Sequence, residues 1–393
     1  MGAPAARTYE LAREWVRAGH KVTVLTAFPH HPTGIVPDEY RGKVFLREKI
    51  DGIDLVRTYV YAVPNEGFLK RVLSYLSFMA SAIFFSLFMS DRSQVIVATS
   101  PQFFVALAGY VVSTIRRKPF VFEVRDLWPD SIVAVGALTN PRVISLLTRL
   151  EYFLYRKADL IVGVAESTRE ILTQNGIPGK KMIIVPNGVD TALFDGCESG
   201  DDIRTVHGLH GKFVVSYIGT HGMAHALETV LDTAKLIEGI PDIHFLFVGE
   251  GARKASLVDY KDRLGLTNVT FLGQQDRASI PAFLAASDVS LVSLRNAPLF
   301  SAVLPSKMFE IMAAERPIIL GVRGEAMALL GRAEAGLCVE PENPDQYRDA
   351  IVKLFEDRDL GYKMGANGRK FVTEGFTRSR LAARYVSSLE AFV

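Results

Sequence analysis

The stretch FVVSYIGTHG, residues 213–222, decides the fold class. Its first part, Phe213–Ile218, is a short apolar run rich in valine, as expected for a strand buried on both faces. Gly219 and Gly222 interrupt the run, and a helical pattern follows near Met223–Glu238. Strand, glycine turn and helix in this order form the building unit of a doubly wound α/β sheet.

The same unit repeats after this stretch. The further strands that we expect are His244–Val248, Val269–Leu272, Val289–Leu294, Ile318–Gly321 and Leu337–Glu340. The helices that we expect between them are Lys254–Leu264, Arg277–Ala286, Ser306–Ala314 and Asp345–Glu356. Strands that alternate with helices of this length predict a parallel sheet with right-handed crossovers.

A second series precedes the stretch. Its expected strands are Val22–Thr26, Val95–Thr99, Phe120–Val124, Leu160–Val164 and Ile183–Pro186. Its expected helices are Thr8–Ala18, Phe103–Ile115, Pro141–Lys157 and Ser167–Asn175. The two series therefore predict two Rossmann-like domains, with a cleft between the carboxyl edges of their sheets.

The domain boundaries follow from the break between the series. We expect an N-terminal domain over residues 1–186, a hinge and surface linker over 187–211, and a C-terminal domain over 212–376. The glycine-rich polar segment from Gly196 to Gly211 is the reason for the linker. A last helix, at about 377–393, is expected to pack back on the N-terminal domain.

The N-terminal domain lacks its first strand. The first pattern is the helix Thr8–Ala18, whereas the first strand of such a sheet lies at its centre. Without it, Val22–Thr26 and Val95–Thr99 have facing backbone groups that lack partners, at about 1–3 kcal/mol for each buried group. We therefore expect the natural chain to begin upstream, with an apolar strand that leads into Gly2.

Composition and missing motifs exclude several classes of protein. The 393 residues carry a net charge of +2, too small for a dedicated nucleic-acid binder. Two distant cysteines exclude a disulfide framework and suit a reducing cytosol. The chain has no P-loop pattern, and Lys254 stands where a strict dinucleotide fingerprint has its third glycine. The segment 357–359 reads D-R-D, but it follows an amphipathic helix, so we interpret it as a solvated turn and expect no metal site.

One segment favours membranes. Val72–Met89 is uncharged, with Lys70 and Arg71 before it. A membrane span, a helix packed on a sheet and a helix lying in the membrane interface all fit this run. Ser74, Ser77 and Ser81 fall on one face. We expect peripheral attachment through this helix, assisted by residues 116–118 (R-R-K).

The chain resembles the retaining glycosyltransferases of family 4, which have the GT-B fold. The resemblance covers essentially the whole chain, and it is strongest to the WbuB-like subgroup that builds O-antigen, colanic acid and related surface polysaccharides. It rests on the order and spacing of six segments, at residues 2–7 (GAPAAR), 19–26 (GHKVTVLT), 125–130 (RDLWPD), 186–190 (PNGVD), 217–222 (YIGTHG) and 305–310 (PSKMFE).

The resemblance implies that the second domain holds a nucleotide-sugar donor. Glycine turns and helix starts can bind a diphosphate through free N–H groups, which favours Gly219, Gly222 and Gly249. Lys307 and Glu310 share a helix face, so Lys307 can meet a phosphate while Glu310 accepts hydrogen bonds from the ribose. Ser306 and Lys254 complete this expected donor site. The first carboxylate of the family's paired glutamates falls at Ala302, where this chain departs from the family.

The candidate catalytic residues are His221 and Asp126. His221 lies in the first glycine turn, and Asp126 follows the strand Phe120–Val124 at its carboxyl end, where sites form in open sheets. A cap for the next helix is the structural alternative for Asp126. Gly2, Arg125 and Trp128 are the candidate residues of the acceptor side.

The sequence therefore predicts an enzyme that transfers a sugar from a nucleoside diphosphate donor, in our expectation a UDP-sugar. The acceptor is expected to be a polyprenyl-diphosphate-linked glycan at the inner face of the plasma membrane, reached from the cytoplasm. Neither metal nor cofactor is expected. A UDP-sugar 2-epimerase of the same fold and a non-catalytic partner of a polysaccharide assembly complex remain as alternatives.

Overall fold

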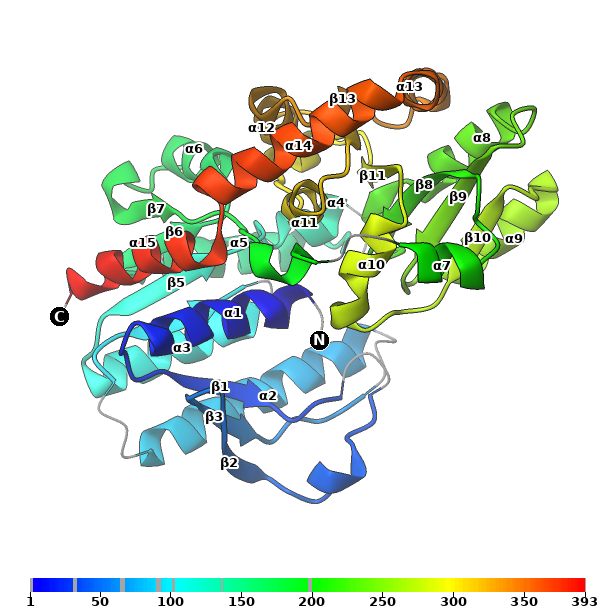
Figure 1. Ribbon diagram of the computed structural model, residues 1–393. Helices are drawn as coiled ribbons and strands as arrows, with labels where there is room; N and C mark the ends of the chain where they lie inside the picture. Colours follow the sequence, from blue (N-terminus) through cyan, green and yellow to red (C-terminus); the bar gives the residue numbers. More distant parts are fainter. Residues whose placement is uncertain are drawn as a thin grey trace. The chain divides into compact units, whose positions relative to one another are not determined.

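The computed structural model describes residues 3–30, 34–63, 68–89, 93–100, 103–134, 136, 138–196 and 200–392. The chain forms two compact units (Figure 1). The N-terminal unit runs to Val185 and includes the end of the chain from Leu381, and the C-terminal unit is Pro186–Arg380.

The C-terminal unit is built on one parallel sheet of six strands. Their order is β10-β9-β8-β11-β12-β13, and every pair is parallel. The strands are β8 (Phe213–Ile218), β9 (Ile243–Val248), β10 (Val269–Leu272), β11 (Val289–Ser293), β12 (Ile318–Gly321) and β13 (Gly336–Cys338). Since the order reverses beside β8, the carboxyl ends of β8 and β11 mark the position where such sheets bind ligands.

Helices connect these strands. They are α7 (Asp201–Val206), α8 (Leu227–Leu236), α9 (Lys254–Leu264), α10 (Ile280–Ala285), α11 (Lys307–Ala313), α12 (Glu325–Ala333), α13 (Pro344–Glu356) and α14 (Arg358–Gly375), with short 3-10 turns η4 (Met223–His225), η5 (Arg277–Ser279) and η6 (Pro298–Ala302). The core between sheet and helices includes Phe245, Phe247 and Leu231, none more than 1% exposed.

The N-terminal unit contains two sheets. One has the order β1-β3-β2, and the other is the parallel sheet β4-β5-β6-β7. The strands are β1 (Thr23–Ala27), β2 (Phe45–Ile50), β3 (Ile53–Thr58), β4 (Ile96–Thr99), β5 (Phe120–Val124), β6 (Leu160–Gly163) and β7 (Met182–Ile184). The helices are α1 (Ala3–Arg17), α2 (Phe68–Phe88), α3 (Phe103–Arg116), α4 (Asp130–Ala134), α5 (Pro141–Lys157), α6 (Glu166–Gln174) and α15 (Arg378–Glu390).

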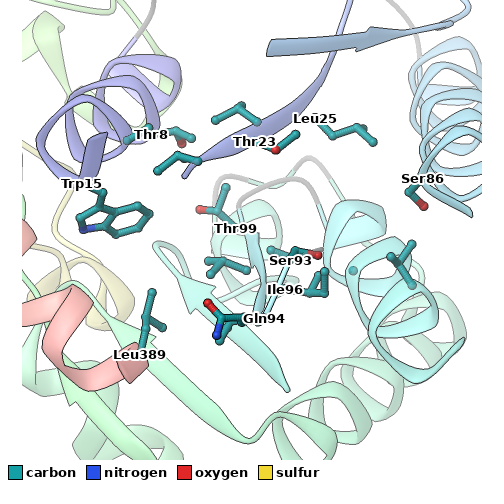
Figure 2. A pocket seen from close by; sticks show the side chains of 18 of the residues that line it. Thr8, Trp15, Thr23, Leu25, Ser86, Ser93, Gln94, Ile96, Thr99 and Leu389 are labelled. Carbon is teal, nitrogen blue, oxygen red and sulfur yellow. The ribbon is translucent and has the colours of Figure 1, made fainter. Parts of the chain in front are cut away.

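A gap separates the two sheets where the sequence predicts a missing strand. In the described part of the chain, β1 pairs with β3 and β4 pairs with β5, and no strand lies between β1 and β4. A cavity of about 960 Å³ occupies this place. Figure 2 shows Thr23 and Leu25 of β1 on one side of it and Ile96 and Thr99 of β4 on another.

The end of the chain stabilises the N-terminal unit. In α15, Leu381, Ala382 and Tyr385 are buried together with Leu11 of α1. The indole Nε1 of Trp15 donates to the carbonyl oxygen of Ala382 at 3.0 Å. These contacts place α15 in the N-terminal unit, the position in which we expected it.

The structure contains elements that the sequence did not predict. β2 and β3 form an antiparallel hairpin, and α12 and α14 are additional helices. Asp357, in the segment that we interpret as a solvated turn, is exposed and caps α14 by accepting a hydrogen bond from Leu360 N at 2.9 Å. The expected linker is folded onto the C-terminal unit, since Leu209 is 1% exposed and Arg204 pairs with Asp288 at 2.7 Å.

Candidate functional site

Two glycine turns meet at the carboxyl ends of β8 and β9. Gly219 and Gly249 have φ angles of 145° and 146°, which side chains rarely allow. A Cβ atom on Gly249 would lie 1.9 Å from the carbonyl oxygen of Gly219. Glycine is therefore required at both turns, where the two backbones contact each other.

A lysine amine lies against the first turn. The Nζ atom of Lys307 is buried, with no hydrogen-bond partner in the structure. It lies 3.7 Å from the ring centroid of Tyr217 and would lie 2.8 Å from a Cβ atom on Gly219. Burial lowers the pKa of Lys307 to about 7, although Glu310 favours the charged form. The amine is thus an unsatisfied donor beside the backbone of Gly219, which carries no side chain.

Glu310 has a partner that the sequence analysis missed. Its Oε1 atom lies 3.3 Å from Nη2 of Arg277 in η5, and both side chains are about one third exposed. The carboxylate is close enough to Lys307 to influence the pKa of the amine. Lys307 and Glu310 therefore lie near each other, and Arg277 adds a cation beside them. The sequence did not indicate Arg277 as a partner of Glu310, because Arg277 lies 33 residues before Glu310, in the short turn η5.

His221 is buried among aromatic rings. It is 0% exposed, with its ring 5.9 Å from Tyr217, 6.1 Å from Phe247 and 5.8 Å from Phe271. Burial first, and then Lys254 and Lys307, lower its pKa to about 4, so the ring is neutral at pH 7. Its backbone N–H donates to Glu250 O at 2.9 Å and its carbonyl accepts from Arg253 N at 2.9 Å. His221 therefore connects the two glycine turns.

The other predicted donor residues occupy different positions. Gly222 packs near His225, whose pKa burial lowers to about 3. Lys254 donates to Glu250 Oε1 at 2.6 Å and to Leu272 O at 3.0 Å, so its charge is already paired. Ser306 is exposed just before α11.

The nearby Arg253 forms a surface ion pair with Glu228. Its Nε atom donates to Glu228 Oε1 at 3.2 Å. The cation at the start of α9 is thus explained by a neighbouring carboxylate, and no phosphate is required to account for it.

In the N-terminal unit, the loop after β5 presents Arg125 and Asp126. The Oγ atom of Ser100 accepts hydrogen bonds from their N–H groups, at 2.8 Å and 3.4 Å. Asp126 is exposed, and desolvation by the surrounding protein raises its pKa against the opposing effect of Arg125. The following helix begins at Asp130, so Asp126 is not the cap of that helix.

Trp128 lies in the same loop, and its side chain packs against the protein. Its ring stacks on Phe103, with centroids 4.9 Å apart and planes at 15°. Its backbone N–H donates to Glu151 Oε1 at 3.2 Å, and the hydroxyl of Tyr155 donates to the same oxygen. Burial raises the pKa of Glu151 to about 8. This buried acid under the loop was missed because nothing in its sequence context distinguishes it from a surface residue of α5.

A buried ion pair lies behind the same loop. The guanidinium of Arg7 lies 3.4 Å from the carboxylate of Glu123, and it donates to Val185 O at 2.9 Å. Burial favours the neutral acid, but Arg7 and Arg125 outweigh it and hold the pKa of Glu123 below its usual value. This pair fastens α1 to the end of β5. The predicted residue Gly2 lies outside the described residues.

Comparisons with known proteins cover both units of the chain. Residues 2–188 match the family model described as glycosyl transferase 4-like domain, and residues 200–371 match the model for glycosyl transferases group 1. The chain is similar to the putative colanic acid biosynthesis glycosyl transferase WcaI of Escherichia coli, with 28% identity over 96% of this chain and 93% of that protein.

Solved structures share the fold. Sucrose-phosphate synthase from Thermosynechococcus elongatus superposes with a TM-score of 0.76 at 17% identity, over 99% of this chain and 93% of that chain. Anabaena HepE, solved in complex with UDP-glucose, gives a TM-score of 0.66 at 18% identity, over 84% of this chain and 86% of that chain. Among the described residues, no cluster of three or more metal-binding side chains occurs.

Proposed function

Because the chain belongs to the family 4 glycosyltransferases of GT-B fold, in the subgroup that builds surface polysaccharides, we propose that it transfers a hexose from a UDP-sugar, with retention at the anomeric carbon. The proposed acceptor is a polyprenyl-diphosphate-linked glycan at the inner face of the plasma membrane. The observation that carries the proposal is the buried, unpaired amine of Lys307 beside the glycine turn at Gly219.

A diphosphate is the ligand that this place suits best. The amine is desolvated, so its charged form lacks the compensation that an anion would supply. Gly219 places no side chain between its backbone and the amine, which would lie 2.8 Å from a Cβ atom there. A phosphate oxygen that accepts from Lys307 would restore the full charge, and the interaction strengthens as negative charge grows on the leaving diphosphate.

Glu310 suits the ribose of the same donor. A carboxylate that is about one third exposed can accept from two neighbouring hydroxyl groups. The guanidinium of Arg277 lies 3.3 Å from this carboxylate. HepE, which shares the fold, was solved with UDP-glucose, and this supports a uridine nucleotide as the first ligand to test.

The chemistry requires little from the protein beyond positioning. The acceptor hydroxyl oxygen forms the new bond to the anomeric carbon, the bond from that carbon to the diphosphate oxygen breaks, and the leaving oxygen takes the acceptor proton. We assign Arg125, Asp126 and Trp128 of the N-terminal unit to the acceptor. His221, neutral and enclosed by rings, serves in this proposal to hold the glycine turns together.

The glycosyltransferase relatives disfavour the two alternative functions. An epimerase needs several carboxylates around the sugar, and Ala302 stands where one would be expected. A non-catalytic partner has no need of an unpaired buried amine at the ligand position. Movement of a labelled sugar from the donor into the lipid fraction of a membrane extract, catalysed by the purified protein, distinguishes transfer from both alternatives.

Titration calorimetry with UDP tests the donor site directly. We predict that Glu310→Gln lowers UDP affinity about ten- to hundredfold, because it removes charge-assisted hydrogen bonds of about 1.5–3 kcal/mol each. Lys307→Ala should reduce turnover more than affinity, because its charge is needed most in the transition state. The exposed Lys353, in α13, provides a matched control as Lys353→Ala. Wild-type affinity in Glu310→Gln would remove this residue from the site.

A further inference from the structure

Helix α2 turns its uncharged polar side chains toward the protein and large apolar side chains outward, the opposite of an ordinary surface helix. Its serines face the protein, where the hydroxyl of Ser81 donates to Tyr59 O at 2.5 Å and Tyr61 N donates to Ser77 Oγ at 2.8 Å. Ser74 and Ser86 are buried. The hydroxyl groups thus satisfy the backbone that follows β3, and the polar side of the helix is used inside the fold.

The outer face of α2 is apolar along its length. The large exposed residues on this face lie at helical spacing, and they are Leu73 (48% exposed), Leu76 (36%), Phe84 (56%), Leu87 (40%) and Phe88 (73%). No charged residue occurs between positions 72 and 89. The helix is long and apolar enough to cross a membrane, yet only 22% of the stretch Lys70–Phe88 is buried in the structure.

Basic residues stand at both ends of this apolar face. Lys70 and Arg71 are exposed in the first turns of α2. At the other end, the guanidinium of Arg116 donates to Met89 O at 2.7 Å, which places the end of α3 beside the end of α2. Arg117 and Lys118 follow and are exposed. Neither α2 nor α3 contains an aspartate or a glutamate.

We propose that this face docks on an anionic lipid bilayer, with α2 lying in the plane of the interface. Acyl chains would cover the leucine and phenylalanine side chains, and anionic headgroups would meet the cations at either end. The serine hydrogen bonds and the contacts with α3 hold α2 on the folded unit, so the helix rests on the membrane rather than crossing it. This surface is independent of the proposed sugar transfer, because it uses no residue of the donor site.

The structure also selects the residues to change. Phe85 packs on Phe45, with ring centroids 5.0 Å apart, so it belongs to the fold. Phe84, Leu87 and Phe88 are the exposed apolar residues at the end of α2 next to Arg117 and Lys118. Their replacement by serine should leave the fold intact, because serine already occurs at five other positions of the helix or its flanks.

Co-sedimentation of the full chain with vesicles tests the proposal. Vesicles that contain phosphatidylglycerol should bind the wild type, and vesicles of phosphatidylcholine alone should bind it much less. The triple variant F84S/L87S/F88S should lower the partition coefficient about tenfold or more, since three apolar side chains no longer enter the bilayer. Changing Lys70, Arg71 and Lys118 to glutamine should remove the preference for anionic lipid.

A matched control uses three apolar residues of similar exposure away from α2. Leu146, Val206 and Leu236 are 65%, 75% and 47% exposed, and their triple serine variant should bind like the wild type. Circular dichroism checks that all variants fold. Equal binding of F84S/L87S/F88S and wild type, or no binding of the wild type to anionic vesicles, would overturn the proposal. Retention in cell membranes after alkaline carbonate extraction would instead show a spanning helix, and that result also overturns it.

Discussion

At the scale of single residues, burial distinguishes the roles that we propose for Lys307 and His221. Lys307 and His221 both lie at the first glycine turn, and burial lowers the pKa of each. The consequences differ, because the amine of Lys307 is an unsatisfied donor beside the Gly219 backbone, whereas the ring of His221 is enclosed by other rings. The lysine therefore lacks a partner that an anionic ligand could supply, and the histidine acts within the protein.

Glu151 offers a prediction at the same scale. Its pKa is about 8 in the folded chain and near 4.5 when unfolded, so between these values the folded state holds a proton that the unfolded state has lost. Stability of the N-terminal unit should therefore fall as pH rises from about 5 to 8. Glu151→Gln retains the oxygen that accepts from Trp128 N and Tyr155, so it should remove this fall and be the more stable form at pH 8.

Tryptophan fluorescence measures the pH dependence of stability in the N-terminal unit. Both tryptophans of the chain, Trp15 and Trp128, belong to the N-terminal unit. Urea unfolding at several pH values should give a difference between wild type and variant that changes by up to about 1.4 kcal/mol per pH unit. A difference independent of pH would show that Glu151 is ionised in the folded chain.

The sequence shows part of the proposed donor site at this scale. Glycine turns after apolar strands, and a lysine and a glutamate three residues apart, are local patterns, so Lys307, Glu310, Gly219 and Gly249 could be found. Arg277, Glu151 and the pair Arg7–Glu123 could not, because each acts through a partner that only the fold brings near. Lys254 was assigned to the ligand because its partner, Glu250, was not considered.

At the scale of elements, strands that are buried on both faces were predicted best. β5, β8 and β12 begin and end where the sequence indicates. The hairpin β2–β3 was missed because β2 is largely exposed and carries three charged residues among six. α14 was missed because four glycines and several charges weaken its helical pattern; its glycines Gly361, Gly365 and Gly368 are buried.

α15 provides the prediction at this scale. A chain that ends at Arg380 loses Leu381, Ala382 and Tyr385, which are at most 4% exposed. Loss of one large core side chain costs about 2–5 kcal/mol, so the N-terminal unit should unfold at much lower urea concentration. A chain that ends at Glu390 is the control, since it keeps all three side chains. UDP affinity should be unchanged in both, because the proposed donor site lies in the C-terminal unit. Unaltered tryptophan unfolding of the shorter chain would contradict the role of α15.

At the scale of the whole molecule, the two-unit organisation could be predicted because a polar, glycine-rich segment separates two series of strands and helices. The segment after Val185 was harder, since its polar composition is typical of a linker. Arg204 and Leu209 hold it in place. The partner of Arg204, Asp288, lies about 80 residues further along the chain, and such distant pairing leaves no local pattern in the sequence.

Transfer of the sugar from donor to acceptor requires the whole molecule. We predict that this transfer needs no divalent metal. Lys307 supplies positive charge at the proposed diphosphate position, which is the contribution a metal would otherwise make. Product formation with a membrane extract should be the same with EDTA as with Mn²⁺. Loss of activity in EDTA that Mn²⁺ restores would contradict this prediction.

The gap between β1 and β4 also governs how the protein behaves at high concentration. Both strands present backbone groups along an edge that no neighbouring strand covers in the described chain, and Val97, in the middle of β4, is 38% exposed. Such edges are templates for strands of other molecules. We therefore expect these edges to favour self-association at high concentration, and a lysine at position 97 is the kind of charged gatekeeper that natural sheets use against it.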